Sequence, residues 1–173
     1  MTTIIQSTDS IYPARVRARL GDHAPKQLFA VGNLDFLAQP KTALFSSSRC
    51  PGDAILRTYD QATSWRDAGR CVVSGFHSPV EKECLRILLR GKGPVIVCPA
   101  RGMPSRMPPD WMKPLAAGRM LVLAIFPPDI ARTSSALAAE RNEFVAALAD
   151  DIWFAHVTPG GKLAKMRKYG DKS

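Results

Sequence analysis

Residues 71–90, CVVSGFHSPVEKECLRILLR, contain the pattern that decides the fold. The apolar run Cys71–Ser74 predicts a short strand, because continuous apolar runs are typical of strands that are buried on both faces. After the turn, Ser78 suits the N-cap of a helix, Pro79 its first position and Glu81 its third, which completes a capping box. The segment therefore predicts a strand, a turn and a helix in that order. The apolar face of the helix consists of Val80, Cys84 and Ile87 or Leu88.

The same alternation continues on both sides of this segment. Short apolar runs bounded by Gly, Pro or Ser predict further strands, and segments with helical periodicity lie between them. We therefore predict an α/β fold, a Rossmann-like, open, mostly parallel sheet with helices on both faces. The further strands are Thr42–Ser46, Val95–Cys98, Met120–Phe126 and Ile152–Val157. The helices are Asp53–Ala68 with Leu56, Tyr59 and Ala62 on one face, Pro79–Arg90, and Ser135–Ala149 with Leu137, Phe144, Val145 and Leu148.

The chain divides into three predicted parts. Residues 1–40 form an N-terminal appendage packed on the core, with a short basic helix over Tyr12–Leu20 and an extended piece over Gln27–Val31. Residues 41–161 form the Rossmann-like core that would bind a nucleotide or a phosphate. Residues 162–173 carry five basic residues and one acid, which predicts a mobile basic tail.

The composition narrows the classes of partner. Apolar residues make up 46% of the 173 residues, which is enough for a sizeable core. The net charge of +9 favours a polyanionic partner, because basic side chains on a phosphate backbone release condensed counterions. A well-solvated basic surface would explain the same excess.

The cysteines and the N-terminus indicate a compartment. Cys50, Cys71, Cys84 and Cys98 form no C-x-x-C motif and no cluster with histidine, so we predict neither a metal site nor a disulfide framework. Reduced cysteines fit the cytosol, and the first residues lack the features of a secretory signal. No apolar run approaches the roughly 20 residues of a membrane span. We therefore expect a cytoplasmic protein without a membrane partner.

Candidate ligand-binding residues follow two of the predicted strands, at the edge where open α/β sheets bind ligands. Ser47, Ser48 and Arg49 would hold a phosphate with hydroxyls, N–H groups and a guanidinium, although they also suit an ordinary polar turn. After the next strand, glycine admits a ligand close to the backbone and the helix start suits an anion. The Glu81 carboxylate would repel a phosphate or accept a ribose hydroxyl, and a capped helix without a ligand is the alternative. The candidates in this second turn are Ser74, Gly75, His77 as a lining residue, and Glu81.

Glycines and basic residues follow two other strands at the same edge. Gly160, Gly161 and Lys162 suit either a phosphate loop or a plain turn. Arg101 and Gly102 lie in a proline-rich loop. The convergence of several cations on one sheet edge is a better argument for a site than any single motif.

Arg141 and Asn142 interrupt an alanine-rich helix, either for a ligand or as a solvated face. With them, the order of motifs resembles the Rossmann-like core of the DNA-processing protein A (DprA/Smf) family over residues 12–163. That family has a G-S-R turn, an S-G-x-A-x-G-I-D turn and an R-N-R-I-I-A-x-L-S segment. The counterparts here are Ser47-Ser48-Arg49, Ser74-Gly75 through Glu81, and Arg141-Asn142 followed by Phe144–Leu148.

The resemblance implies a protein that binds single-stranded DNA in recombination or natural transformation and loads a RecA-type recombinase. No catalytic residue and no cofactor is predicted. The alternative is a sensor for a mononucleotide, or an enzyme similar to the "Lonely Guy" phosphoribohydrolases of the same superfamily. Their P-G-G-x-G-T-x-x-E signature matches only Pro159-Gly160-Gly161 here, and the glutamate is missing. Assembly into a homo-oligomer is compatible with each of these functions.

Overall fold

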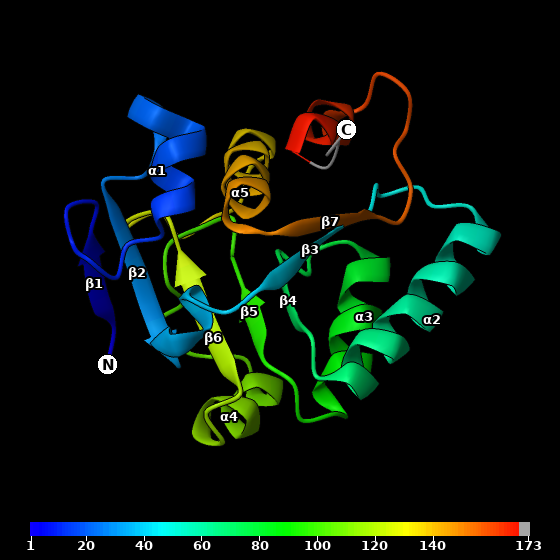
Figure 1. Cartoon of the computed structure of the whole chain (residues 1–173), viewed down its shortest axis with the longest axis horizontal. Coiled ribbons are helices and arrows are strands. Elements are labelled where there is room, and N and C mark those ends of the chain that lie inside the picture. Colours follow the sequence, from blue (N-terminus) through cyan, green and yellow to red (C-terminus); the bar gives the residue numbers. More distant parts are fainter. Residues whose placement is uncertain (170–173) are drawn as a thin grey trace.

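Seven strands form one sheet in the order β1-β2-β6-β5-β4-β3-β7 in the computed structural model, which describes residues 1–169 (Figure 1). The five strands β6, β5, β4, β3 and β7 pair in parallel with their neighbours. Strand β2 pairs antiparallel with both β1 and β6. The prediction of a mostly parallel, Rossmann-like sheet is confirmed. The strands are β1 (Thr3–Gln6), β2 (Gln27–Gly32), β3 (Lys41–Phe45), β4 (Cys71–Ser74), β5 (Val95–Val97), β6 (Met120–Ala124) and β7 (Asp151–Phe154).

Five α-helices and three 3-10 helices occur within residues 1–169. None of the helices in this described part is long and apolar enough to span a membrane. Helix α4 begins where the predicted proline-rich loop after β5 ends, in a stretch for which the sequence analysis predicts no element. The α-helices are α1 (Ala14–Leu20), α2 (Gly52–Ala68), α3 (Pro79–Leu89), α4 (Pro109–Ala116) and α5 (Ser135–Leu148). The 3-10 helices are η1 (Gly21–His23), η2 (Leu34–Leu37) and η3 (Lys162–Tyr169).

Alternate residues of the central strands face two hydrophobic clusters, as expected for a sheet covered on both faces. In β4, Val73 contacts the cluster under α1, α5 and η3, and Val72 contacts the cluster under α2, α3 and α4. The predicted apolar face of α2 is wrong at Leu56, which is 67% exposed. Helix α2 instead buries a face of three small side chains and one tryptophan, and it packs against α3. The buried residues of α2 are Ala54, Thr58, Ala62 and Trp65.

Two segments of residues 1–40, β1 and β2, belong to the sheet itself, and this corrects the prediction of an appendage packed on it. Strand β2 pairs with β6 through Val31 and Val122, and β1 extends the same edge. Ile5 is buried, while the other residues of β1 are exposed. An edge strand with one buried residue has little of the apolar pattern by which strands are recognised.

The predicted mobile tail is also corrected, as far as it is described. Residues 162–169 form η3, which packs on α5 and buries Leu163 and Met166. The Tyr169 hydroxyl donates to Glu143 Oε2 at 2.9 Å. These two apolar residues, three positions apart in the sequence, anchor the basic segment on α5. Residues 170–173 lie outside the described part of the chain.

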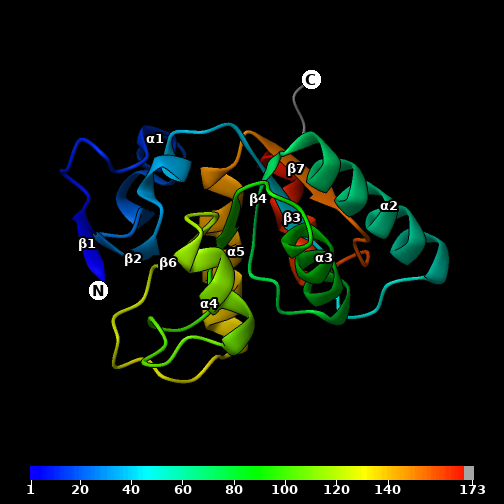
Figure 2. The same ribbon diagram turned by 90° about the horizontal axis from the view of Figure 1, so that it is seen from below.

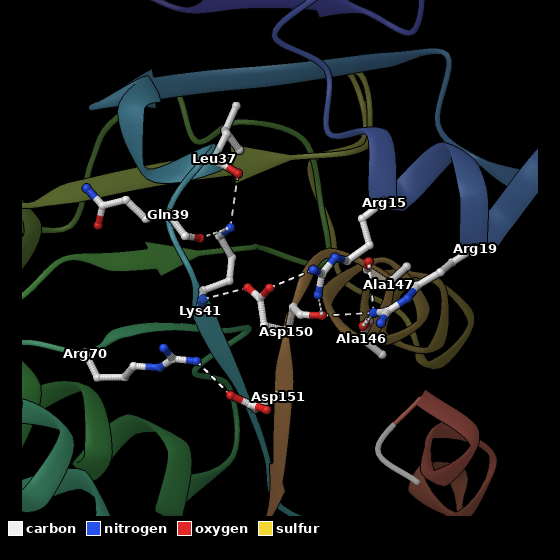
Figure 3. A network of polar contacts seen from close by, with 11 residues as sticks. Arg15, Arg19, Leu37, Gln39, Lys41, Arg70, Ala146, Ala147, Asp150 and Asp151 are labelled. Atoms are coloured by element: carbon white, nitrogen blue, oxygen red, sulfur yellow. Dashed lines mark hydrogen bonds and ion pairs between the residues drawn. The ribbon is translucent and has the colours of Figure 1, made fainter. Parts of the chain in front are cut away.

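Two arginines of the basic helix α1 stabilise the fold at the C-terminal end of α5 (Figure 3). Arg15 Nη1 donates to Ala149 O at 3.0 Å, and its Nη2 lies 2.7 Å from Asp150 Oδ1. The last carbonyl groups of a helix lack intrahelical donors and carry partial negative charge, which cations neutralise. Part of the positive charge of the protein therefore stabilises the fold rather than being free to bind a ligand. Arg19 Nη1 donates to the carbonyl oxygens of Ala146, Ala147 and Ala149.

We expect Asp150→Asn to destabilise the protein at neutral pH by about 0.5–1 kcal/mol and to have no effect in strong acid. Burial opposes ionisation of the Asp150 carboxyl. The hydrogen bond donated by the Lys41 backbone N–H and the positive charges of Arg15, Lys41 and Arg70 outweigh this effect, so the pKa of Asp150 lies below its ordinary value. A carboxyl with a lowered folded pKa adds stability above its unfolded pKa, about 3.9, and loses it as the pH falls through the folded pKa. Melting temperatures by circular dichroism between neutral pH and about pH 2 would test this.

The control is Asp22→Asn, at an exposed carboxyl in η1 that pairs with no residue of 1–169. A difference between the Asp150 variant and the wild type that persists unchanged into strong acid would contradict the assignment to charge.

Candidate functional site

The topology creates a crevice at the carboxyl ends of β3 and β7. From β3 the chain winds through α2, α3 and α4 to β6, and these helices cover one face (Figure 2). Helix α5 then returns along the opposite face to β7, which pairs with β3 on its other side. The loops that follow β3 and β7 therefore diverge to opposite faces. Open α/β sheets bind ligands at such a switch point.

A pocket of about 590 Å³ lies at this point. Its walls come from the turns after β3, β4 and β7 and from α5, so four segments that are distant in sequence meet there. Most of the residues predicted for the site line it. These are Ser47, Ser48, Arg49, His77, Glu81, Arg141, Asn142, Gly161 and Lys162.

Five other predicted residues do not line this pocket. Ser74 is fully buried, and its hydroxyl accepts the N–H of Phe76 at 3.1 Å. Gly75 lies against Arg141, and Gly160 is an exposed turn residue with φ of +70° beside the pocket. Arg101 and Gly102 line a separate pocket after β5, so the predicted convergence of all the cations is not observed.

Glu81 joins the turn after β3 to the turn after β4. Its side chain is buried, and Oε2 accepts the N–H of Ser46 at 2.9 Å. Oε1 accepts the N–H groups of His77 and Ser78 at 3.0 and 3.1 Å. The carboxylate is thus directed at backbone donors and holds two walls of the pocket in place. The geometry gives no support to a role in accepting a ribose hydroxyl.

Arg141 forms the inner end of the pocket. It is 5% exposed, and its Nη1 donates to Cys98 O at 2.9 Å while Nε donates to Asn142 Oδ1 at 2.8 Å. Burial lowers the pKa of the guanidinium, and the nearby carboxylate of Glu81 opposes that shift. A Cβ on Gly75 would lie 2.1 Å from Arg141 Nη1. The close approach that the glycine permits is therefore made by Arg141 rather than by a ligand.

The turns after β3 and β7 are also joined to each other. The Ser47 hydroxyl donates to His156 O at 3.0 Å and accepts the N–H of Thr158 at 3.4 Å. This hydroxyl is occupied, which leaves the exposed Ser48 as the hydroxyl of this turn open to a ligand. Arg49 and Lys162 are exposed, and neither forms an ion pair within residues 1–169.

The arrangement favours binding of an anion at the rim. The first turn of α3 offers little, because Glu81 accepts the Ser78 N–H, Pro79 has none, and the Glu81 N–H donates to Ser78 Oγ at 3.3 Å. The charge of Glu81 is offset by Arg141, and Arg49 and Lys162 add exposed positive charge at the rim. Within residues 1–169, no three His, Cys, Asp or Glu side chains are grouped as metal ligands would be.

Sequence reasoning missed several wall residues. Ser78 and Pro79 were recognised only as parts of a helix cap, although the first turn of that helix is also a wall. Ala138 and Leu163 carry no polar signal and reach the pocket because α5 and η3 pack together. Thr158 also lines the pocket, and its position directly before the Pro159-Gly160-Gly161 turn could have identified it from the sequence.

The sheet order defines an open α/β protein of the Rossmann type, with a candidate ligand site in the cationic crevice. The chain belongs to the DNA recombination-mediator protein A family, whose model matches residues 3–158. The resemblance of the sequence to the DprA family is thereby confirmed.

Two solved structures share this fold. DNA processing protein A (DprA) from Streptococcus pneumoniae superposes with a TM-score of 0.78 at 20% identity, covering 96% of this chain and 60% of that one. DNA processing protein A from Helicobacter pylori, described for its single-stranded DNA binding mode, superposes with a TM-score of 0.75 at 19% identity. The superposition covers 98% of this chain and 75% of that one. The chain thus spans less than two thirds of the Streptococcus structure. A search of curated protein sequences finds no match.

Proposed function

We propose that this chain binds single-stranded DNA in recombination or natural transformation, with the strand's phosphates at the rim of the crevice. The observation that carries the proposal is that Arg49 and Lys162, which follow the adjacent strands β3 and β7, are exposed on one pocket whose inner end holds Arg141. Exposed cations at a switch point attract phosphates, and the net charge of +9 would raise the rate of encounter.

Family membership supports the same proposal, since the Helicobacter relative is described as binding single-stranded DNA. Engagement of a RecA-type recombinase, self-association and a cytoplasmic location belong to the proposal as well. Three of the four cysteines are buried, and their thiols have raised pKa values, of about 11 for Cys71 and about 12 for Cys84 and Cys98. Unreactive thiols of this kind fit a protein that works with reduced cysteines.

We expect Arg49→Ala/Lys162→Ala to bind an oligo-dT strand roughly tenfold more weakly than the wild type at moderate salt. The plot of log affinity against log salt should become shallower by about 0.7 for each phosphate that the protein no longer neutralises. Fluorescence anisotropy of a labelled strand over a salt series measures both quantities. Both side chains are exposed, so these substitutions should leave the fold intact.

The matched control is Lys26→Ala, which removes an exposed cation at the β1–β2 edge, away from the crevice. No binding by the wild type at low salt would contradict the proposal. A thermal-shift screen of mononucleotides would then test the crevice as a site for a small ligand.

A further inference from the structure

A second groove, of about 700 Å³, lies between α3 and α4. Four cations and one carboxylate line it: Lys82, Arg86, Arg90, Lys113 and Asp110. The cations on α3 recur every four residues, so that they follow one side of the helix with steps of about 6 Å. Such spacing is similar to the distance between neighbouring phosphates in an extended strand.

The groove also offers an aromatic and apolar surface. Trp111 lines it while packing partly against the core. The rest of the apolar lining is Phe76, Leu85, Leu89 and Pro109. A half-buried indole is held in place by the core and leaves area on which a base can stack. Basic residues interleaved with an aromatic side chain are the combination by which proteins hold single strands without reading their sequence.

The groove and the crevice adjoin each other at the start of α3. Phe76 lines the groove, and His77, Ser78 and Pro79 line the crevice directly after it in sequence. Lys82 of the groove follows Glu81 of the crevice. The two sites therefore lie on either side of one helical turn, close enough for a continuous strand.

We infer that the α3–α4 groove is a second subsite, which holds the continuation of a DNA strand bound in the crevice, with a base on Trp111 and phosphates along Lys82, Arg86 and Arg90. This inference rests on the proposed function. Charge complementarity favours a polyanion over a protein partner, because Asp110 provides the only carboxylate among the described residues that line the groove. The ion pair of Arg86 with Glu83, at 2.8 Å, is largely exposed and yields readily to a phosphate.

The test compares oligo-dT strands of about 6 and about 20 nucleotides, because only the longer one can fill both subsites. Arg86→Glu/Arg90→Glu and Trp111→Leu should each weaken binding of the long strand about tenfold and leave the short strand unchanged. Arg49→Ala should weaken binding of both strands. The matched control is Arg57→Glu, an exposed cation on α2 outside the groove.

Tryptophan fluorescence provides a separate readout. The long strand should quench part of the emission, and Trp111→Phe should abolish that quenching but keep the affinity, since phenylalanine still stacks. Trp65 and Trp153 pack edge to face with their ring centroids 6.0 Å apart, and they would contribute an unquenched background. Melting temperatures would show that each variant is folded.

The second subsite would be overturned if the groove variants bound the long strand as tightly as the wild type while Arg49→Ala bound it more weakly. The proposed function would then still stand. Failure of the wild-type protein to bind either strand would overturn both.

Discussion

Glu81→Ala is expected to lower the free energy of unfolding by about 3–5 kcal/mol, because three backbone N–H groups in the pocket walls lose their acceptor. The carboxylate is 7% exposed and accepts from Ser46, His77 and Ser78 at 2.9–3.1 Å. Hydrogen bonds to charged groups contribute about 1.5–3 kcal/mol each, and water that enters the space left behind recovers part of their sum. Urea denaturation followed by circular dichroism would measure the loss.

The control for this variant is Glu83→Ala, two positions along the same helix. Glu83 is partly exposed and pairs with the exposed Arg86, so its loss should cost about 0.5 kcal/mol or less. Glu81→Gln, which keeps an acceptor oxygen and loses the charge, should fall between the two. A stability of Glu81→Ala within about 1 kcal/mol of the wild type would show that the carboxylate does not hold the turns together.

Gly75→Ala is expected to destabilise the protein by about 2–4 kcal/mol and to weaken the proposed binding of single-stranded DNA, since it displaces a buried guanidinium. The new Cβ would lie 2.1 Å from Arg141 Nη1 and 2.2 Å from Cζ. Arg141 is 5% exposed and would have to give up its bond to Cys98 O to make room. Urea denaturation and the anisotropy assay together report both effects.

Gly52→Ala is the matched control, because a Cβ there meets nothing within 4 Å and the residue lies in α2. Alanine should be neutral or stabilise that helix by up to about 1 kcal/mol. In an Arg141→Ala background the Gly75→Ala penalty should shrink, since the clashing group is absent. Equal penalties in the two backgrounds would contradict the contact.

Local sequence signals predicted much of the fold. The capping box of α3 is present, with Glu81 N–H donating to Ser78 Oγ at 3.3 Å and Ser78 N–H to Glu81 Oε1 at 3.1 Å. The strand Cys71–Ser74 has the predicted bounds, and the other core strands begin or end within a few residues of them. Helix α4 was missed because Pro108 is its N-cap, Pro109 its first residue and Pro114 lies inside it, which is the composition of a loop.

The sequence by itself determined the class of fold and the sheet edge that carries the candidate site, because apolar runs, helix caps and glycine turns are local features. Only the tertiary structure decided which charges are exposed at the candidate site and which bind other parts of the fold. Arg19 reaches the end of α5, and Arg141 lies against Gly75 and Cys98, while Arg49 and Lys162 stay exposed. These pairings join residues that are distant in the chain. They depend on the order of the strands and on which face each helix covers, and no local pattern encodes either.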